Sequence, residues 1–138
     1  GAAQHRLMRV ASATAMAAIA AVVANLLLRA AAVAVFDIPQ PEFEPLQARA
    51  VVLSTLGGVA SAGVVYAAIL RLAGDPARVF LVVAAVALVL SLWAPLSLGL
   101  ADPPENPGTD AESVGTLIAM HVLAAAISVP VLLRISPR

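Results

Sequence analysis

Long apolar blocks alternate with short polar connectors along this chain. The blocks lie at about residues 10–36, 50–70, 79–100 and 114–133. About 20 helical residues cross the hydrocarbon core of a bilayer, so each block is long enough to span a membrane. The pattern predicts an all-α protein: a transmembrane bundle of four antiparallel helices that forms one membrane domain over residues 1–138.

The connectors differ in charge between the two sides of this bundle. Connectors 37–49 and 101–113 are acidic, whereas the N-terminus, connector 71–78 and the C-terminus are rich in arginine. The arginines of the basic segments are Arg6, Arg9, Arg71, Arg78, Arg134 and Arg138; the acids of the two acidic connectors are Asp37, Glu42, Glu44, Asp102, Glu105, Asp110 and Glu112. Positive charge is retained on the cytoplasmic side of membrane proteins. We therefore expect a multi-pass protein of the cell membrane with both termini in the cytoplasm and acidic outer loops.

Composition agrees with a chain surrounded by lipid. The sequence is 62% hydrophobic and 12% charged, whereas a soluble domain carries about a quarter charged residues. Little chain remains outside the blocks, which excludes a separate soluble catalytic module, and nothing supports binding of nucleic acid. Cysteine is absent, which excludes disulfides, thiolate catalysis and Cys-ligated metals. The first block is interpreted as a retained span, because its apolar run is too long for a signal peptide.

Small residues and proline shape the predicted spans. Small side chains at four-residue spacing let membrane helices approach closely, so we predict helix packing at such positions. These positions are Gly57, Gly58, Ser61, Ala62 and Gly63 in the second span and Gly115 in the fourth. Pro95 lies near the outer end of the third span, where loss of a backbone hydrogen bond predicts a kink or an end of the helix.

Two ionisable residues lie inside apolar blocks, where such groups are energetically unfavourable. Arg29 precedes Phe36 by seven residues and His121 follows Val114 by seven. At 1.5 Å per residue, both are expected roughly 10 Å below the outer ends of their helices. An outer polar pocket for a ligand or cofactor is one hypothesis. Its candidate residues are Asn25, Arg29, Thr55, Trp93 and His121.

Structural roles compete with this pocket. The Arg29 side chain is expected to extend toward the headgroups or the acidic connector, and His121 to be a neutral imidazole bonded to another span. His121 has no nearby intramembrane acid and the serines have no nucleophile context, so we predict no catalytic residues and no metal. No cofactor is required, although His121 leaves open contact with a pigment or haem within a larger complex.

Short segments across the chain resemble an uncharacterised family of small prokaryotic four-span membrane proteins, a domain of unknown function. The segments are Phe36-Asp37-Ile38-Pro39, the small-residue run of the second span, Ser91-Leu92-Trp93-Ala94-Pro95 and Met120-His121. The resemblance implies a four-helix membrane fold and no established activity. We predict a noncatalytic accessory or interaction subunit, in contact with lipids and with other membrane subunits or itself. The alternative is a small-ligand binding or transport protein that uses the pocket around Arg29 and His121.

Overall fold

The computed structural model describes residues 1–38 and 42–135, and these are helical apart from short connections. The elements are α1 (Ala2–Phe36), η1 (Glu44–Leu46), α2 (Ala48–Leu72), α3 (Pro76–Ser91), α4 (Trp93–Leu100) and α5 (Ala111–Leu133). α3 and α4 together form one membrane-length unit, which gives four helices long and apolar enough to cross a bilayer within the described part of the chain. The fold is therefore all-helical and fits a four-span membrane protein.

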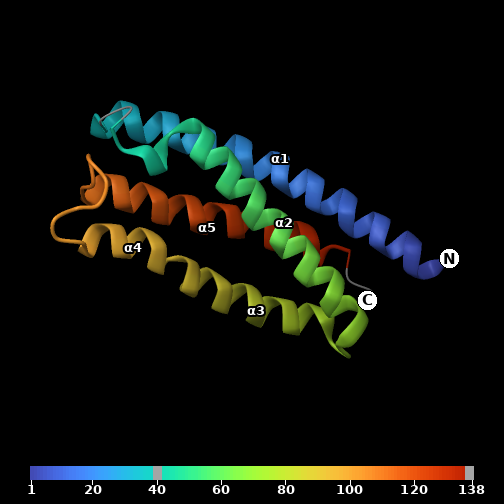
Figure 1. Ribbon diagram of the computed structural model, residues 1–138. Helices are drawn as coiled ribbons and strands as arrows, with labels where there is room; N and C mark the ends of the chain where they lie inside the picture. Colours follow the sequence, from blue (N-terminus) through green and yellow to red (C-terminus); the bar gives the residue numbers. More distant parts are fainter. Residues whose placement is uncertain (39–41, 136–138) are drawn as a thin grey trace.

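The helices pack unevenly (Figure 1). α1 packs against both α2 and α5, whereas α3 and α4 lie along α5. In this view α2 runs diagonally across the bundle and approaches α3 at the end that precedes the α2–α3 turn. It stays packed on α1 from Thr55 to Leu70. We call the end with the connectors before α2 and α5 the acidic end, and the end with the start of α1 and the α2–α3 turn the basic end.

All four spans begin earlier than the hydrophobic pattern predicts, at residues 2, 48, 76 and 111 in place of 10, 50, 79 and 114. α1 starts at Ala2, because the preceding polar segment contains helix-forming residues and no proline or glycine after its first residue. α5 starts at Ala111, where the carboxylate of Asp110 accepts a hydrogen bond from the Ser113 N–H at 2.7 Å. This N-cap satisfies one of the free amides of the first turn.

Proline interrupts the third span as expected. Pro95 has no N–H to donate to the carbonyl of Ser91, four residues earlier, so the helical hydrogen-bond pattern is broken there. The structure divides the span into α3 and α4 at Leu92. The predicted kink is thereby confirmed.

Only one glycine of the predicted packing seam makes a close helix contact. A Cβ at buried Gly63 would lie 2.7 Å from Thr14 Cγ2 on α1, and closer still to Thr14 Oγ1. Added Cβ atoms at Gly57, Gly58 and Gly115 would have no neighbour within 4 Å. The predicted intramolecular seam is not formed at these three positions. The face of α2 that packs on α1 carries Thr55, Val59, Gly63 and Tyr66 at three- and four-residue spacing, so Gly57 and Gly58 lie on other faces of the helix.

Of the two remaining seam residues, Ala62 packs as predicted and Ser61 does not. Ala62 is half-buried and packs on the basic-end core cluster that contains Val10 and Tyr66. Ser61 is exposed, and its hydroxyl donates to Gly57 O at 2.7 Å. Ala62 therefore contributes to helix packing, whereas Ser61 does not contact a neighbouring helix through a hydrogen bond.

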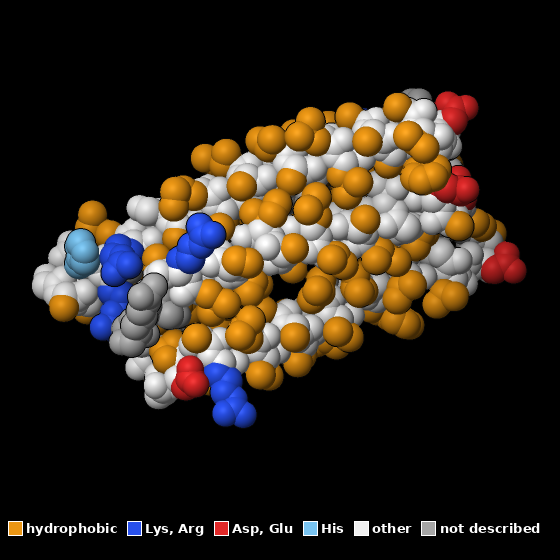
Figure 2. Space-filling view, turned by 180° about the vertical axis from the view of Figure 1, so that it is seen from behind, with side chains coloured by type: hydrophobic (Ala, Val, Ile, Leu, Met, Phe, Trp, Pro, Cys, Tyr) orange, Lys and Arg blue, Asp and Glu red, His pale blue; other side chains and the backbone are white. Residues whose placement is uncertain are grey.

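Charged side chains gather at the two ends of the molecule (Figure 2). Apolar side chains cover the middle of the face shown, and many large ones are exposed, including Ile19 at 67% and Val64 at 72%. Such a continuous apolar surface indicates contact with membrane lipids. Asp75 is an acid at the basic end, where its carboxylate caps α3 by accepting from the Arg78 N–H at 3.2 Å.

The Gly63 contact predicts an unequal effect of alanine along α2. Gly63→Ala is expected to lower the free energy of unfolding by about 1–3 kcal/mol, since the β-branched Thr14 is stiff and bonded to Val10 O at 2.8 Å. Gly57→Ala is the control; it should leave stability unchanged or raise it by up to about 1 kcal/mol through helix propensity. Unfolding in bicelles measures both.

A double variant separates this clash from other effects. Thr14→Ala removes Oγ1 and Cγ2, so Gly63→Ala should be less harmful in its presence. If the losses in the free energy of unfolding of the two single variants simply add in the double variant, the Thr14 side chain does not contact the alanine at position 63.

Candidate ligand-binding site

A cavity of about 420 Å³ lies between α2, α3 and α5, with α1 contributing Asn25 to its wall. At the basic end α2 and α3 are joined by Tyr66 and Phe80, whose ring centroids are 4.6 Å apart and whose planes are tilted by 52°. Beyond this contact α2 turns away from α3 (Figure 1). The cavity fills the resulting wedge, and its volume is within the range of small-molecule sites.

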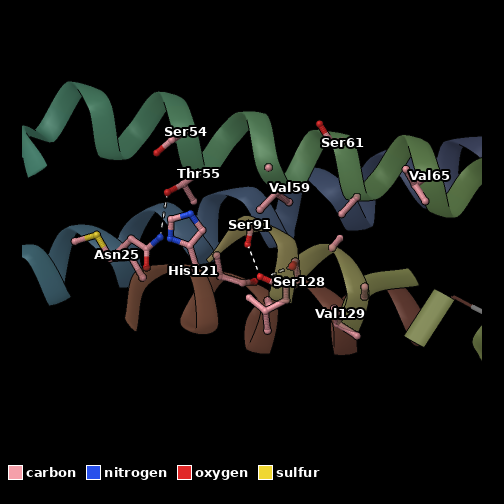
Figure 3. Close-up of a pocket in the computed structure, with 18 of the residues that line it drawn as sticks. Asn25, Ser54, Thr55, Val59, Ser61, Val65, Ser91, His121, Ser128 and Val129 are labelled. Atoms are coloured by element: carbon pink, nitrogen blue, oxygen red, sulfur yellow. Dashed lines mark hydrogen bonds between the residues drawn. The ribbon is translucent and has the colours of Figure 1, made fainter. Parts of the chain in front are cut away.

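Most of the lining is apolar, and the polar side chains come from all four membrane-length helices. They are Asn25, Ser54, Thr55, Ser61, Ser91, His121 and Ser128. Figure 3 shows Asn25, Thr55 and His121 in one part of the cavity, with Ser128 farther along α5. The sequence thus places a few polar groups on an otherwise apolar wall, as ligand sites do.

Asn25 carries an unusual polar atom. Its side chain is 2% exposed, and its amide Nδ2 donates to Thr55 Oγ1 at 3.0 Å. Its carbonyl oxygen, Oδ1, is buried and has no hydrogen-bond partner among the described residues. Burying a carbonyl oxygen without a hydrogen bond costs about 1–3 kcal/mol. This oxygen therefore needs a hydrogen-bond donor, which the described residues do not provide.

His121 presents a second hydrogen-bonding atom to the cavity. Its Nδ1 lies 2.7 Å from the carbonyl oxygen of Leu117, one turn earlier on α5. Because a carbonyl only accepts, Nδ1 carries the hydrogen, and Nε2 of the neutral ring is an acceptor. The expected bond to another span is replaced by this bond within α5, since the carbonyl four residues back is within reach of the ring.

The serine hydroxyls of the cavity donate to their own helices. The bonds are Ser54 to Val51 O at 3.3 Å, Ser61 to Gly57 O at 2.7 Å, Ser91 to Leu88 O at 2.7 Å and Ser128 to Ala124 O at 2.7 Å. Each bond uses the hydroxyl hydrogen and leaves oxygen lone pairs. The polar groups of the cavity therefore offer mainly acceptors.

Arg29 and Trp93 lie apart from this cavity. Arg29 is half-buried, and its Nε donates to Leu46 O of η1 at 2.7 Å, so the side chain extends toward the acidic end as the structural interpretation expects. Trp93 is 66% exposed at the start of α4. Of the predicted pocket residues, the structure brings together Asn25, Thr55 and His121.

Helix boundaries explain why Arg29 and His121 do not meet. Arg29 lies seven residues from the end of α1 at Phe36, whereas His121 lies ten residues after the start of α5 at Ala111. At 1.5 Å per residue the depths are roughly 10 Å and 15 Å. His121 is consequently deeper by about one turn, and it lines the same cavity as Asn25.

Sequence reasoning missed Ser128 and treated Ser61 as a packing residue. Both line the cavity. A helical period was available as a signal, because Leu117, His121, Ala124 and Ser128 follow a spacing of three and four residues along one face. The spacing alone does not show that this face borders an empty volume.

The lining provides hydrogen bonding without charged groups. Amide, hydroxyl and imidazole side chains supply all of its polar atoms, and the cavity has no Asp, Glu, Lys or Arg on its wall within the described residues. No group of three His, Cys, Asp or Glu in the described part of the chain is placed to hold a metal ion. The arrangement is suited to noncovalent binding.

Comparison with known proteins identifies one family. The sequence model of a family of unknown function (DUF6069) matches residues 2–138. Neither a curated protein nor a solved structure matches the chain significantly. The resemblance seen in the short sequence segments is confirmed over nearly the whole chain.

The contact of Arg29 with the connector predicts a local effect on backbone dynamics. In Arg29→Met the Nε donor to Leu46 O is lost, so amides of the connector, such as Gln47 N–H, should exchange hydrogen at least tenfold faster. The control is Arg49→Met, which removes an exposed charge at the start of α2. Hydrogen exchange measured by mass spectrometry distinguishes them; equal rates in the two variants would contradict a role for Arg29 in holding η1.

Proposed function

The chain belongs to this family of unknown function, and we propose that it is a noncatalytic membrane protein that holds a small amphipathic ligand in the cavity between α2, α3 and α5. The observation that carries the proposal is Asn25: the residue lines a 420 Å³ cavity, and its Oδ1 is buried with no hydrogen-bond partner among the described residues. A ligand donor at this atom offsets the cost of burying it. The apolar remainder of the lining suits the body of the same ligand.

The proposed setting is a cell membrane crossed by an antiparallel bundle. Arginine-rich segments lie at the basic end and acidic connectors at the acidic end, which supports cytoplasmic termini by the positive-inside rule. Because the chain has no cysteine, a single Glu105→Cys variant reports the side directly. Labelling by an impermeant maleimide on intact cells supports this orientation, and labelling only after permeabilisation contradicts it.

An accessory role in a larger membrane complex is a second candidate. Gly57 is exposed and has open space where a side chain would be, so another subunit or a second copy could approach α2 there. A pigment or haem reaching His121 would belong to such a complex. Ligand binding has the more specific support, because it assigns a partner to Asn25.

Two neighbouring glycines provide a matched test of ligand binding. Gly58 lines the cavity and Gly57 does not, and neither has a neighbour that a new Cβ would meet. Gly58→Leu should fill part of the cavity and reduce the bound small molecule at least several-fold, whereas Gly57→Leu should retain it. The measurement is native mass spectrometry of protein extracted with its surrounding lipids, without detergent.

The same spectra separate the two candidate functions. A small-molecule mass lost only in Gly58→Leu supports the proposal. A wild-type protein with no such mass, or equal occupancy in both variants, contradicts it. A stable complex with other protein subunits that Gly57→Leu disrupts favours the accessory role.

A further inference from the structure

We infer that the ligand is a neutral, single-chain lipid-like alcohol, with its hydroxyl group at Asn25, Thr55 and His121 and its hydrocarbon chain in the wedge between α2 and α3. The inference rests on the proposed function and adds the chemical class of the ligand. It follows from the donor and acceptor atoms at one end of the cavity and from the shape and lining of the rest.

The hydrogen-bonding atoms at the acidic-end part of the cavity require a donor. Asn25 Oδ1 and His121 Nε2 are both acceptors, and Oδ1 has no partner in the described protein. A carboxylate or a phosphate offers only acceptors at these atoms and would be repelled. The required group is one that carries a hydrogen on oxygen or nitrogen.

The same atoms favour a group that also accepts. The Thr55 hydroxyl receives the Asn25 amide hydrogen and has its own hydrogen to donate. A hydroxyl group on the ligand donates to Asn25 and accepts from Thr55, which satisfies both. If the Asn25 amide turned over, its NH₂ would face the ligand and the hydroxyl would accept from it, so a hydroxyl fits both orientations. In that orientation a carboxylate or phosphate is disfavoured because no Lys or Arg among the described residues lines the cavity.

A charged head group on the ligand is disfavoured, because the described lining of the cavity carries no counter-ion. No acidic side chain among the described residues lines the cavity, so an ammonium head would be buried unpaired. Arg29, the nearest intramembrane cation along α1, instead contacts Leu46 O at 2.7 Å. A neutral head is therefore the one that these surroundings stabilise.

The length and lining of the cavity match a hydrocarbon chain. Its wall on α5 runs from Leu117 to Val129, about 18 Å at 1.5 Å per residue. One leaflet of the hydrocarbon core is of similar thickness, roughly 15 Å. Toward the basic end the lining includes Phe80, Val65 and Val83, and the hydroxyls there, of Ser61 and Ser128, donate to their own helices.

The cavity opens sideways, at the level of the spans. Its rim residues Gly58 and Ser61 on α2 and Val83 and Ala87 on α3 are exposed, whereas the polar floor at Asn25 is buried. Figure 3 shows Ser61 and Val65 along α2, opposite the helix that carries Ser91. A molecule dissolved in the bilayer can therefore enter between α2 and α3 without passing through water.

Water alone leaves the cavity poorly filled. One water could donate to Asn25 Oδ1, but a water occupies about 30 Å³ and needs two to four polar partners. Most of the 420 Å³ is bordered by apolar side chains that provide none. Hydration of Asn25 is thus an outcome to be tested against occupation by an alcohol.

Matched photoreactive probes test the head group. Full-length protein in nanodiscs is irradiated with a twelve-carbon alcohol that carries a diazirine at the far end of its chain, or with the methyl ether of the same molecule. The ether keeps the chain and the oxygen but has no hydrogen to donate. We expect the alcohol to label cavity residues at least fivefold more than the ether, with unlabelled dodecan-1-ol competing.

A variant tests whether Asn25 causes the preference for the alcohol over the ether. Asn25→Leu keeps the volume and removes the amide, so it should reduce alcohol labelling about fivefold and leave ether labelling unchanged. The matched control is Thr116→Val, a buried α5 threonine outside the cavity whose hydroxyl donates to Glu112 O at 2.8 Å. It should keep the wild-type preference. The alcohol-to-ether labelling ratio is measured on the wild-type protein alone. It therefore tests the head group even if Asn25→Leu does not fold.

The outcomes separate the inference from the proposed function. Equal labelling of the cavity by both probes overturns the hydroxyl head and leaves ligand binding standing. A preference for the alcohol that persists in Asn25→Leu also overturns the inference. No cavity labelling by either probe, with water the sole occupant, overturns both.

Discussion

The path of α2 across the bundle is the constraint on which the cavity depends. At Gly63 the absence of a side chain lets α2 touch Thr14 of α1, and nearby the contact between the tilted rings of Tyr66 and Phe80 joins α2 to α3. Toward the acidic end α2 remains held to α1, through the bond between Asn25 and Thr55. Because α2 follows α1 while α3 and α4 follow α5, α2 and α3 separate toward the acidic end (Figure 1), and the 420 Å³ wedge lies between them.

The apolar surroundings explain why most polar side chains in the spans bond within the protein. Lipid offers no hydrogen bonds to a polar group, so such groups are satisfied internally. Cavity serines donate to carbonyls of their own helices, His121 to Leu117 O, and Arg29 to Leu46 O. Asn25 Oδ1 is the exception among the buried side-chain atoms of the described residues. Because the residue Asn25 lines the cavity, a ligand there is the partner that we propose for it.

Hydropathy and helix geometry predict much of this fold. Apolar length gives four membrane-length helices, and Pro95 gives the interruption at Leu92. The extension of Arg29 toward the connector follows from the cost of a cation in hydrocarbon. These features depend on residues close together in sequence, or on the contrast between lipid and water.

Hydropathy and helix geometry do not predict the path of α2 across the bundle, nor the cavity beside it. Hydropathy does not report which face of a helix meets a neighbour, so Gly57, Gly58 and Gly63 look equivalent although only Gly63 makes the close contact. The depth of His121 depends on the start of α5 at Ala111, which the Asp110 cap determines. Asn25, Thr55 and His121 were predicted as pocket residues, but their separation from Arg29 depends on contacts between distant segments.

The most direct measurement is solid-state NMR of the Asn25 side-chain carbonyl in native membranes. Asn25 and Asn106 are the asparagines of the chain, so selective ¹³C labelling of asparagine yields two side-chain signals, and Asn25→Leu assigns them. Ligand binding predicts magnetisation transfer between the Asn25 carbonyl and protons of a nonprotein molecule with a hydrocarbon chain. Transfer only to water and to protein protons would contradict it.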